Sequence, residues 1–377
     1  MPQATNPPNT VYVTGDAVVD QSENPGEFKN RLAIQVTLTT LPGKPATLTY
    51  SGMGSLLTVR RYQMVIIDGR DIEDGDGTLT LKGNDSNNKA LLTVDGGGAY
   101  AYLELRNGII RDNTNTSQSI ANGRDNFNRQ LFGGGVAVYD RGFFLMNGGE
   151  ITGCRSLFGA AIYISGMHGG TNGTQVWDPN PGAGFFAAEI HAGKIWGNTC
   201  HFGDGWGGGA GSYPAWFMRK SSGIVFVTNG RVLMSGGEIS GNTSNGAMGA
   251  VYLHANSSLY MQSGIIYGSD AKAGTDTVLQ GEEKANKAGS GSDYHNSIGR
   301  TADGDVNMQT SNMGRAYAVK RAGSGFEPIN NADGTDDKWG RKVFNDGNDY
   351  DYQFGRQVYH GTGKNTIWME DGVLKNP

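Results

Sequence analysis

Apolar and polar residues follow one pattern that returns every few dozen residues along this chain. Each copy contains two apolar residues two positions apart, then a Gly, one variable residue, an Ile and a small polar segment. The copies lie at 103–110, 144–151, 188–195, 232–239 and 259–266. A repeat of this length is typical of a solenoid in which each copy forms one turn of a coil.

When the copies are aligned on their Gly, each column has one chemical character. Apolar residues two positions apart point to the same side of a strand, so these columns predict the core of the coil. The apolar columns are Leu103, Phe144, Ala188, Val232 and Leu259; Leu105, Met146, Ile190, Met234 and Met261; and, after the Gly, Ile110, Ile151, Ile195, Ile239 and Ile266.

Two further columns predict how the coil turns and how its copies are joined. The Gly column, Gly108, Gly149, Gly193, Gly237 and Gly264, indicates a sharp corner at which a Cβ would be costly. The column five residues after it contains Asn113, Cys154, Asn198, Asn242 and Ser269. Stacked amides of this kind bond to the copies above and below, which predicts an asparagine ladder.

A second family of strands is expected at 135–138, 161–164 and 250–253. Val136 and Ile162 are 26 residues apart, and Gly237 and Gly264 are 27 apart, so an uninterrupted turn takes about that many residues. Longer turns are then expected to contain insertions at 113–132, at about 166–184 and at about 199–213. Loops that leave a regular scaffold are common places for binding surfaces.

Three segments are expected along the chain. Residues 1–45 read as an N-terminal tether and cap, residues 46–269 as the parallel β-helix, and residues 270–377 as a linker followed by a C-terminal cap or a small appended unit. End caps are expected because an uncovered terminal turn exposes strand edges and core.

Charge and hydropathy narrow the class of protein. The net charge of −5 has no basic stripe, so nucleic acid is not an expected partner. No run of eighteen apolar residues is present, so no transmembrane segment is expected. The first ten residues are rich in Pro and Asn and are not a signal peptide, and we interpret them as a tether that remains after an upstream export signal is removed.

Residues 236–243 (GGEISGNT), 249–253 (GAVYL) and 65–69 (VIIDG) resemble the repeats of right-handed parallel β-helix proteins of the pectin-lyase-like superfamily. The resemblance extends to bacterial cell-surface proteins with polymorphic outer-membrane repeats. It implies an all-β right-handed parallel β-helix that is secreted or held at the cell surface. The superfamily contains polysaccharide lyases, glycoside hydrolases, phage tailspikes and noncatalytic adhesins, so the resemblance leaves the activity open.

The column one residue after the corner Gly contains two carboxylates, Glu150 and Glu238, with Lys194 between them. With turns ~4.8 Å apart the carboxylates would lie ~9.6 Å apart, near the upper limit of the separation in inverting glycosidases. The alternative is a Glu-Lys-Glu ladder that keeps like charges from stacking, and this alternative is favoured.

Columns expected to face solvent contain candidate ligand-binding residues. Exposed Trp and Tyr rings beside Arg, Asn and Gln could form a track for sugars, because pyranose faces stack on rings while amides and guanidinium groups bond hydroxyls. Aromatic residues half-covered by the insertions are an equally good interpretation. The candidates are Arg111, His191, Trp196 and Tyr267 on the coil, and Trp177 and Trp206 in the insertions.

Metal and thiol chemistry have weaker signals. Asp71, Asp74 and Asp76 could supply oxygen ligands to calcium, but they do not fit a known calcium-loop pattern, and solvated turns are favoured; no cofactor is expected. Cys154 and Cys200 leave the same corner of adjacent turns, displaced by two residues. A disulfide between them is plausible, although two unpaired thiols are slightly favoured.

Two functions are compatible with these residues. One is a noncatalytic extracellular or cell-surface β-helix, adhesin-like or structural, that binds a polysaccharide or a matrix partner. The other is a polysaccharide lyase or glycoside hydrolase. The regular coil has no convergent acidic cluster in its aligned columns, which favours the first. Coils of this kind can also associate side by side or end to end.

Overall fold

The computed structural model describes residues 9–20, 34–69, 78–97, 100–116, 132–165, 186–200, 223–228, 230–244, 248–253, 258–267, 284, 286–287, 296–299, 315–322, 325–328, 367–370 and 373–375. The regular elements in these ranges are all β-strands. The described part of the chain contains no helix with the length and apolar character needed to cross a bilayer.

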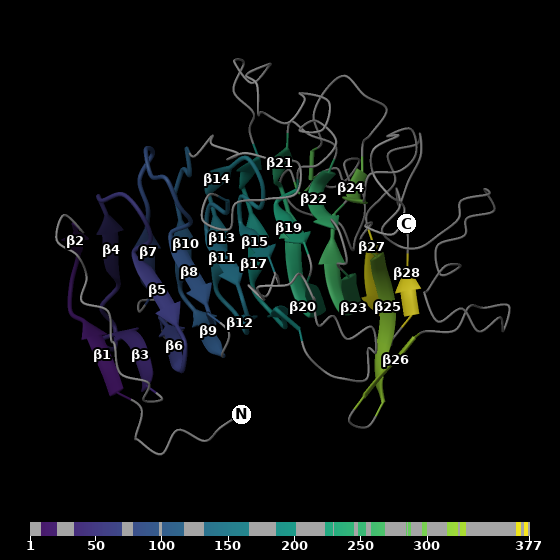
Figure 1. Ribbon diagram of the computed structural model, residues 1–377, viewed down its shortest axis with the longest axis horizontal. Coiled ribbons are helices and arrows are strands. Elements are labelled where there is room, and N and C mark those ends of the chain that lie inside the picture. The colour runs from purple at the N-terminus through teal and green to yellow at the C-terminus, as the bar shows by residue number, and fades with distance from the viewer. Residues whose placement is uncertain are drawn as a thin grey trace, which may run out of the picture.

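The strands form a parallel β-helix whose long axis is horizontal in Figure 1, with the strands crossing that axis. One complete turn contains four strand segments, which we call legs one to four. In the central turn these are β12 (Gly142–Met146), β13 (Glu150–Thr152), β14 (Arg155–Ser156) and β15 (Ile162–Ser165). Each leg pairs in parallel with the same leg of the turns before and after it, which builds continuous sheets along the coil.

Legs one and two belong to one eighteen-stranded sheet that bends at the Gly corner. Leg one contains β1 (Asn9–Val13), β3 (Ile34–Thr40), β6 (Gln63–Asp68), β9 (Ala101–Asn107), β12, β16 (Ala188–Ile190), the first parts of β20 (Arg231–Ser240) and β23 (Ser258–Ile266), and β25 (Arg315–Ala322). Leg two contains β2 (Ala17–Val19), β4 (Ala46–Tyr50), β7 (Leu79–Lys82), β10 (Ile109–Arg111), β13, β17 (Lys194–Trp196) and the second parts of β20 and β23.

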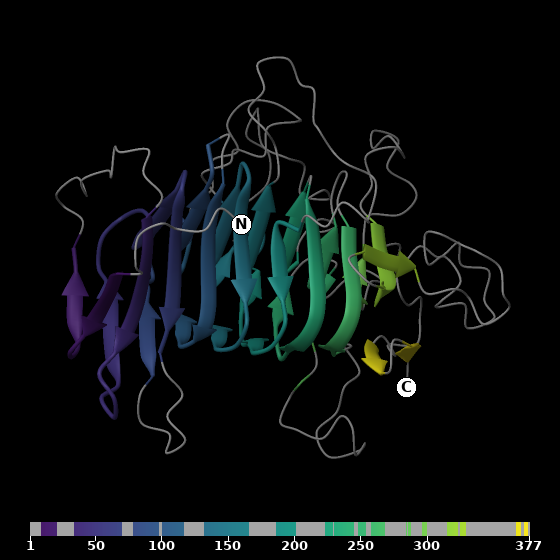
Figure 2. The same cartoon turned by 90° about the horizontal axis from the view of Figure 1, so that it is seen from below.

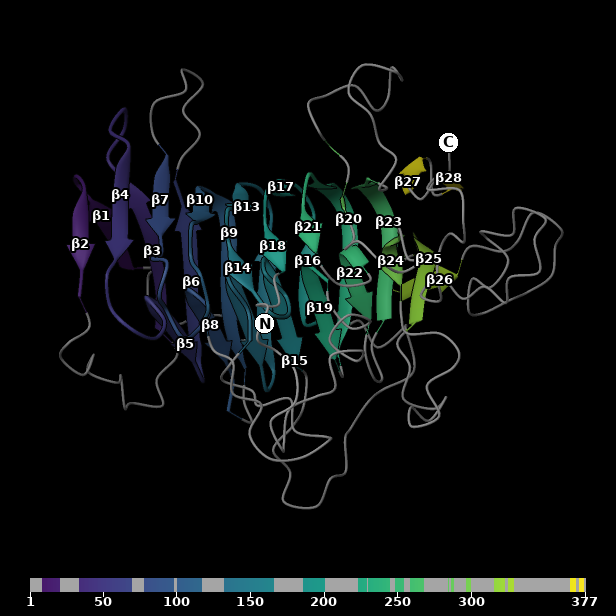
Figure 3. The ribbon, with the colours of Figure 1, turned by 90° about the horizontal axis from the view of Figure 1, so that it is seen from above.

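The other two legs form smaller sheets. Leg three contains β14, β18 (Thr199–Cys200) and β21 (Thr243–Ser244). Leg four contains β5 (Leu57–Arg60), β8 (Leu92–Asp95), β11 (Val136–Tyr139), β15, β19 (Val225–Thr228), β22 (Met248–Leu253) and β24 (Asn296–Gly299). Figure 3 shows these strands following one another along the coil.

The predicted core columns stack inside the coil. Ile110, Ile151, Ile195, Ile239 and Ile266 are neighbours in consecutive strands of leg two, and all are buried. Leg one supplies Phe144, Ala188 and Val232 in the same way. Because equivalent residues meet their own kind in the next turn, the core is continuous from Val13 to Ile266.

The Gly column forms the predicted corner. All five glycines have a left-handed backbone, with φ between 72° and 121°. A Cβ on Gly193 would lie 2.4 Å from the carbonyl oxygen of Gly149 in the preceding turn, so the turns approach too closely for a side chain. A second left-handed corner follows four residues later, at Asp112, Gly153, Gly197 and Gly241, and was not expected from the sequence.

The asparagine ladder exists, with one member corrected. The amide of Asn198 donates to Asn242 Oδ1 at 3.1 Å, and that of Asn242 donates to Asn286 Oδ1 at 2.8 Å. The next member is therefore Asn286, not the expected Ser269, which lies outside the described residues. The reason is the spacing in sequence: Asn242 and Asn286 are 44 residues apart. The extra residues of this turn therefore lie after β23 and before Asn286, where the alignment of the copies did not predict them.

The coil extends further than residues 46–269 at both ends. β1 and β3 already pair in parallel within leg one. Beyond β23, Lys287 bridges to leg three, β24 pairs with β22 and β25 pairs with β23, which adds one more turn. Three further strands follow at this end, β26 (Gly325–Pro328), β27 (Ile367–Glu370) and β28 (Val373–Lys375), and each is antiparallel to its partner. Figure 2 shows the last two in yellow beside the C-terminus.

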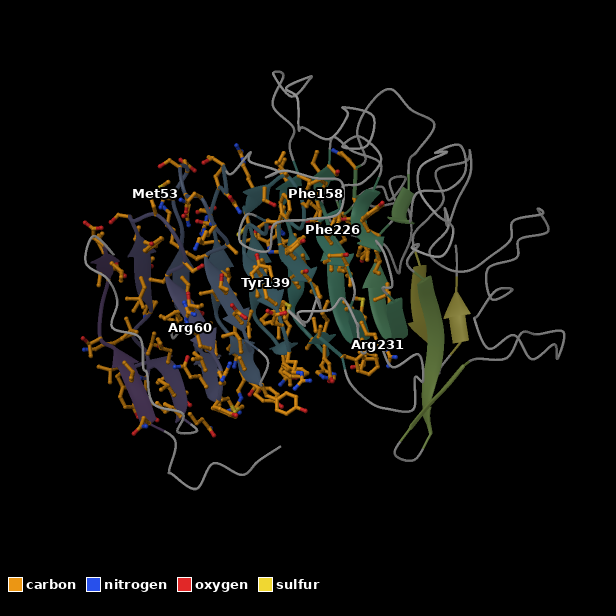
Figure 4. All side chains as sticks on the ribbon, in the orientation of Figure 1. Met53, Arg60, Tyr139, Phe158, Phe226 and Arg231 are labelled. Carbon is orange, nitrogen blue, oxygen red and sulfur yellow. The ribbon has the colours of Figure 1, made fainter. Side chains whose placement is uncertain are left out.

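The outward face of leg four carries a buried aromatic cluster. Tyr163, Phe226 and Tyr252 are neighbours in consecutive strands and point away from the coil core. Phe132 and Phe158 lie against them, with Phe132 and Phe158 meeting edge to face at 4.9 Å between ring centroids. All five side chains are buried. Phe158 and Phe226 are labelled in Figure 4. Outward-facing side chains of this leg therefore form a second apolar layer.

Candidate functional site

The candidate site is the surface on both sides of the Gly corner, which we call the corner face. Its leg-one side carries Glu104, Arg106, Asn147, Glu189, His191 and Ser235, and its leg-two side carries Arg111, Glu150, Lys194, Trp196 and Glu238. The strands hold these side chains outward because the alternate positions are occupied by the core columns.

The Glu-Lys-Glu ladder is confirmed. Lys194 lies directly between Glu150 and Glu238 in the parallel register of leg two. Each carboxylate also has a hydrogen-bond donor: Trp196 donates to Glu150, and Ser240 donates to Glu238 at 2.6 Å. With a cation between them and separate partners, the two carboxylates are arranged as charges in a ladder rather than as a facing acid and base.

Trp196 is the most prominent side chain of the corner face. Trp196 is 43% exposed, and its Nε1 donates to Glu150 Oε2 on the neighbouring strand at 2.8 Å. This bond fixes the orientation of an exposed apolar surface. Arg111 lies in the same column two turns earlier, is exposed and pairs with Asp112 at 2.8 Å. A ring and a guanidinium therefore project from the same leg.

Tyr267 does not face solvent as expected. Its side chain is only 1% exposed. Lys284, which follows β23 in the chain, places Nζ 3.2 Å from the Tyr267 hydroxyl, 5.0 Å from its ring centroid and 3.4 Å from Glu238 Oε2. Burial lowers the pKa of Lys284, but the Tyr267 and Glu238 contacts outweigh it and the pKa is raised. Tyr267 is thus part of a covered contact at the end of the corner face.

On the leg-one side, a compact polar network surrounds Glu104. Arg106 donates to both oxygens of Glu104, at 2.7 and 3.1 Å, and Asn147 donates to the same carboxylate at 2.8 Å from the next turn. Arg106 also lies 3.9 Å from Asp68. The hydrogen bond to Glu104 raises the pKa of Arg106, against the opposing effect of burial. Glu104 is buried and fully engaged, while Arg106 and Asn147 remain exposed to solvent.

Further along the same side, Glu189, His191 and Ser235 form a hydrogen-bonded chain. Glu189 Oε2 lies 2.8 Å from His191 Nε2, and Ser235 Oγ contacts His191 Nδ1. Sequence reasoning missed this arrangement, although the aligned columns contained its signal, since His191 and Ser235 occupy the same column in adjacent turns. In serine hydrolases the nucleophile contacts Nε2 and the acid contacts Nδ1. The two nitrogens are exchanged here, so the chain is a set of oriented polar groups rather than a copy of that triad.

The remaining expected site residues are the tryptophans of the insertions and the candidate calcium ligands. Trp177, Trp206, Asp71, Asp74 and Asp76 lie outside the described residues, so neither the insertion rings nor the calcium ligands are placed. Within the residues that are described, no three His, Cys, Asp or Glu side chains converge as a metal site would require.

Cys154 and Cys200 are both buried, free thiols. Cys200 pairs in register with Ser156, two residues beyond Cys154, as the sequence offset predicts. The thiols point to different acceptors: Cys154 lies 3.5 Å from the carbonyl oxygen of Thr152, and Cys200 lies 3.2 Å from that of Gly223. The favoured expectation of unpaired thiols therefore agrees with the structure.

The chain was compared with protein-family models, with curated proteins and with solved structures, and no match was found in any of the three.

Proposed function

We propose that this chain is a noncatalytic extracellular or cell-surface β-helix protein, adhesin-like or structural, that binds a glycan on its corner face. The observation that carries the proposal is Trp196, a large exposed ring held in place by its bond to Glu150. Sugar rings stack on such surfaces, and an immobilised ring loses little conformational entropy on binding.

The neighbouring groups suit a polyhydroxylated ligand. Lys194 lies beside Glu150 in the next strand and is exposed, and His191 and Lys194 stand on opposite sides of the same corner glycine. Cations and oriented amide, hydroxyl and imidazole groups at one turn spacing from each other can bond the hydroxyls or carboxylates of a polysaccharide that lies along the coil. The insertions at about 166–184 and 199–213 are proposed as additional contacts.

The resemblance to pectin-lyase-like proteins and bacterial cell-surface repeat proteins supports export and a carbohydrate or matrix partner. A lyase or glycosidase of that superfamily is the alternative. The engaged carboxylates and the intervening Lys194 favour binding without turnover, since a glycosidase needs two carboxyl groups free to act on one bond.

The test is a polysaccharide array read both for retained protein and for new reducing or unsaturated ends. For a retained glycan we expect Trp196→Ala to weaken binding at least tenfold, or about 1.4 kcal/mol. Tyr100→Ala is the matched control, because Tyr100 is 42% exposed on another part of the coil and should bind like the unaltered protein.

Three outcomes would count against parts of this proposal. Unaltered binding by Trp196→Ala would move the site to the insertions. Product release that is lost in Glu150→Gln or Glu238→Gln would support the enzyme. Absence of retention on every polysaccharide would leave a matrix protein as the partner, which a binding assay on matrix proteins would then have to show.

A further inference from the structure

The two ends of the coil differ in how their strand edges are finished. At the C-terminal end, β27 pairs antiparallel to β23, and β25 continues into an antiparallel pair with β26. These strands interrupt parallel growth. At the N-terminal end, β1 pairs with β3 and β2 pairs with β4, and no other described strand pairs with β1 or β2 (Figure 1). One edge of each strand therefore presents backbone groups that can bond another strand.

The side chains at this edge are apolar and exposed. Val11, Tyr12 and Val18 are 48%, 47% and 71% exposed, and they make up three of the seven large apolar side chains found exposed among the described residues. Val11 lies in register with Leu38, which packs against the core, so it belongs to the inward-facing column of the coil. Its exposure means that the interior of the coil is open at this end.

The two described edge strands lack the features that usually protect against strand pairing. Natural edge strands carry Lys, Pro or a bulge that prevents another chain from joining. β1 (NTVYV) and β2 (AVV) contain no charged residue and no Pro, and both pair with their partners without a register shift.

We propose that two copies of this chain associate through their N-terminal edges, with β1 of one copy antiparallel to β1 of the other. A two-fold axis brings the same patch of both copies together, and an uncharged strand is compatible with itself in this arrangement. At the opposite end, the antiparallel strands on β23 and β25 interrupt parallel head-to-tail growth in legs one and two. The pairing places Val11 near its counterpart and covers the open end of both cores.

The test is sedimentation velocity of the full chain over a range of concentrations. We expect a dimer with twice the 40.1 kDa of one chain, which dissociates on dilution. Hydrogen exchange should show that the amides of residues 9–13 become protected only as the dimer forms. Val11→Lys places two like charges together and should yield a monomer, whereas Tyr100→Lys, away from the edge, should remain dimeric.

If Val11→Lys lowers the melting temperature, Tyr12→Lys replaces it, because Tyr12 lies on β1, is 47% exposed and points away from the core between Val11 and Val13. A protein that is monomeric at all concentrations would overturn the proposal. So would amides of residues 9–13 that are equally protected in the dilute monomer, since another part of the same chain would then cover the edge. Species larger than a dimer would show open-ended association instead of the closed two-fold pair.

Discussion

The corner face and the outward face of leg four occupy equivalent positions on the coil, because both consist of side chains that point away from its core. On the corner face these side chains are charged or polar apart from Trp196, and several are exposed, such as Arg111 and Lys194. On leg four they are Tyr163, Phe226 and Tyr252, which are buried. Pointing out of the coil is therefore not the same as facing water.

The difference arises next to the strands rather than in them. Phe132 immediately precedes the segment that leads into β11, and Phe158 lies between β14 and β15. Both rings therefore come from the corner that precedes leg four, and they pack on its outward face. The Gly corner between legs one and two has room for no side chain. In the part of the chain that the structure describes, no corner residue of that kind therefore covers the polar groups beside it. Corners decide which outward faces are available to a ligand.

The largest effect is expected inside the coil, from Ile239→Asp. The loss of stability in this variant is the reference for substitutions on either outward face. Ile239 is buried between Ile195 and Ile266. An unpaired buried charge costs several kcal/mol, comparable with the stability of a whole domain, so the variant should not fold. Soluble variant that unfolds cooperatively in a thermal melt would contradict the core register.

Phe226→Ala tests whether leg four has a second core. Phe226 contacts Phe158, Tyr163 and Tyr252 with ring centroids 5.1 to 5.5 Å apart. Removing a buried Phe usually costs about 3–5 kcal/mol. We expect a loss of that order in the free energy of unfolding in urea. A loss below about 1 kcal/mol, as for a typical surface residue, would mean that the cluster is only a surface feature.

Tyr267→Phe tests the place where the corner face is covered. The change removes the hydroxyl that accepts from Lys284 but keeps the ring beneath the ammonium. We expect a loss of about 1–2 kcal/mol, since a hydrogen bond to a charged group is lost. Lys284→Met should cost more, because it also removes the contact with Glu238, and Tyr267→Phe should add little to that loss in the double variant. Additive effects of the two changes would show that the pair does not interact.

Trp196→Ala is expected to leave stability within about 0.5 kcal/mol of the unaltered protein, because Trp196 is an exposed surface residue. Chemical denaturation measures this directly. Comparing this variant with Phe226→Ala tests the difference between the two outward faces directly, because both residues are outward-facing aromatics. A loss as large as that of Phe226→Ala would show that Trp196 is structural and would remove the basis of the proposed binding site.

Near neutral pH the smallest effects concern the thiols. Burial raises the pKa of Cys154 and Cys200 to about 12. Because these thiols hold their protons more tightly in the folded chain, they favour the unfolded state less at low pH than at high pH. Their contribution to the free energy of unfolding is complete below the unfolded pKa of about 8.5 and is lost as the pH rises toward 12, because the unfolded chain then releases protons that the folded chain retains. At pH 8 alkylation should be slow in the native protein and should reveal two thiols after unfolding without reductant. If no thiol reacts after unfolding, the two cysteines are joined by a disulfide. Cys154→Ala should reduce the loss of stability at alkaline pH.

Much of the coil could be predicted from the sequence because each copy carries its own corner and its own inward residues. Gly193 and Ile195 suffice to place one turn relative to the next. The extra turn that contains Lys287 and β24 was missed because its strands are short and separated by residues that interrupt the repeat. Ser269 was taken for a ladder member for the same reason, since the count of residues from Gly264 takes no account of those that follow β23.

The candidate site was harder to predict, since exposure depends on contacts between segments distant in sequence. Tyr267 and Trp196 share a column, yet Lys284 covers the first and nothing comparable among the described residues covers the second. The Glu189, His191 and Ser235 chain was within reach of the sequence, because the column alignment already placed His191 beside Ser235. The three residues match no linear motif, because His191 and Ser235 meet only across adjacent turns.

The orientation of the ladders also has a mechanical consequence. The strands cross the long axis of the coil, so their backbone hydrogen bonds run along that axis. The side-chain hydrogen bonds from Asn198 to Asn242 and from Asn242 to Asn286 run in the same direction. Tension between β1 and β25 would load these bonds along their own direction, and each turn contacts only its neighbours. Under force such a coil would yield turn by turn, extending in steps while the remaining turns keep their shape.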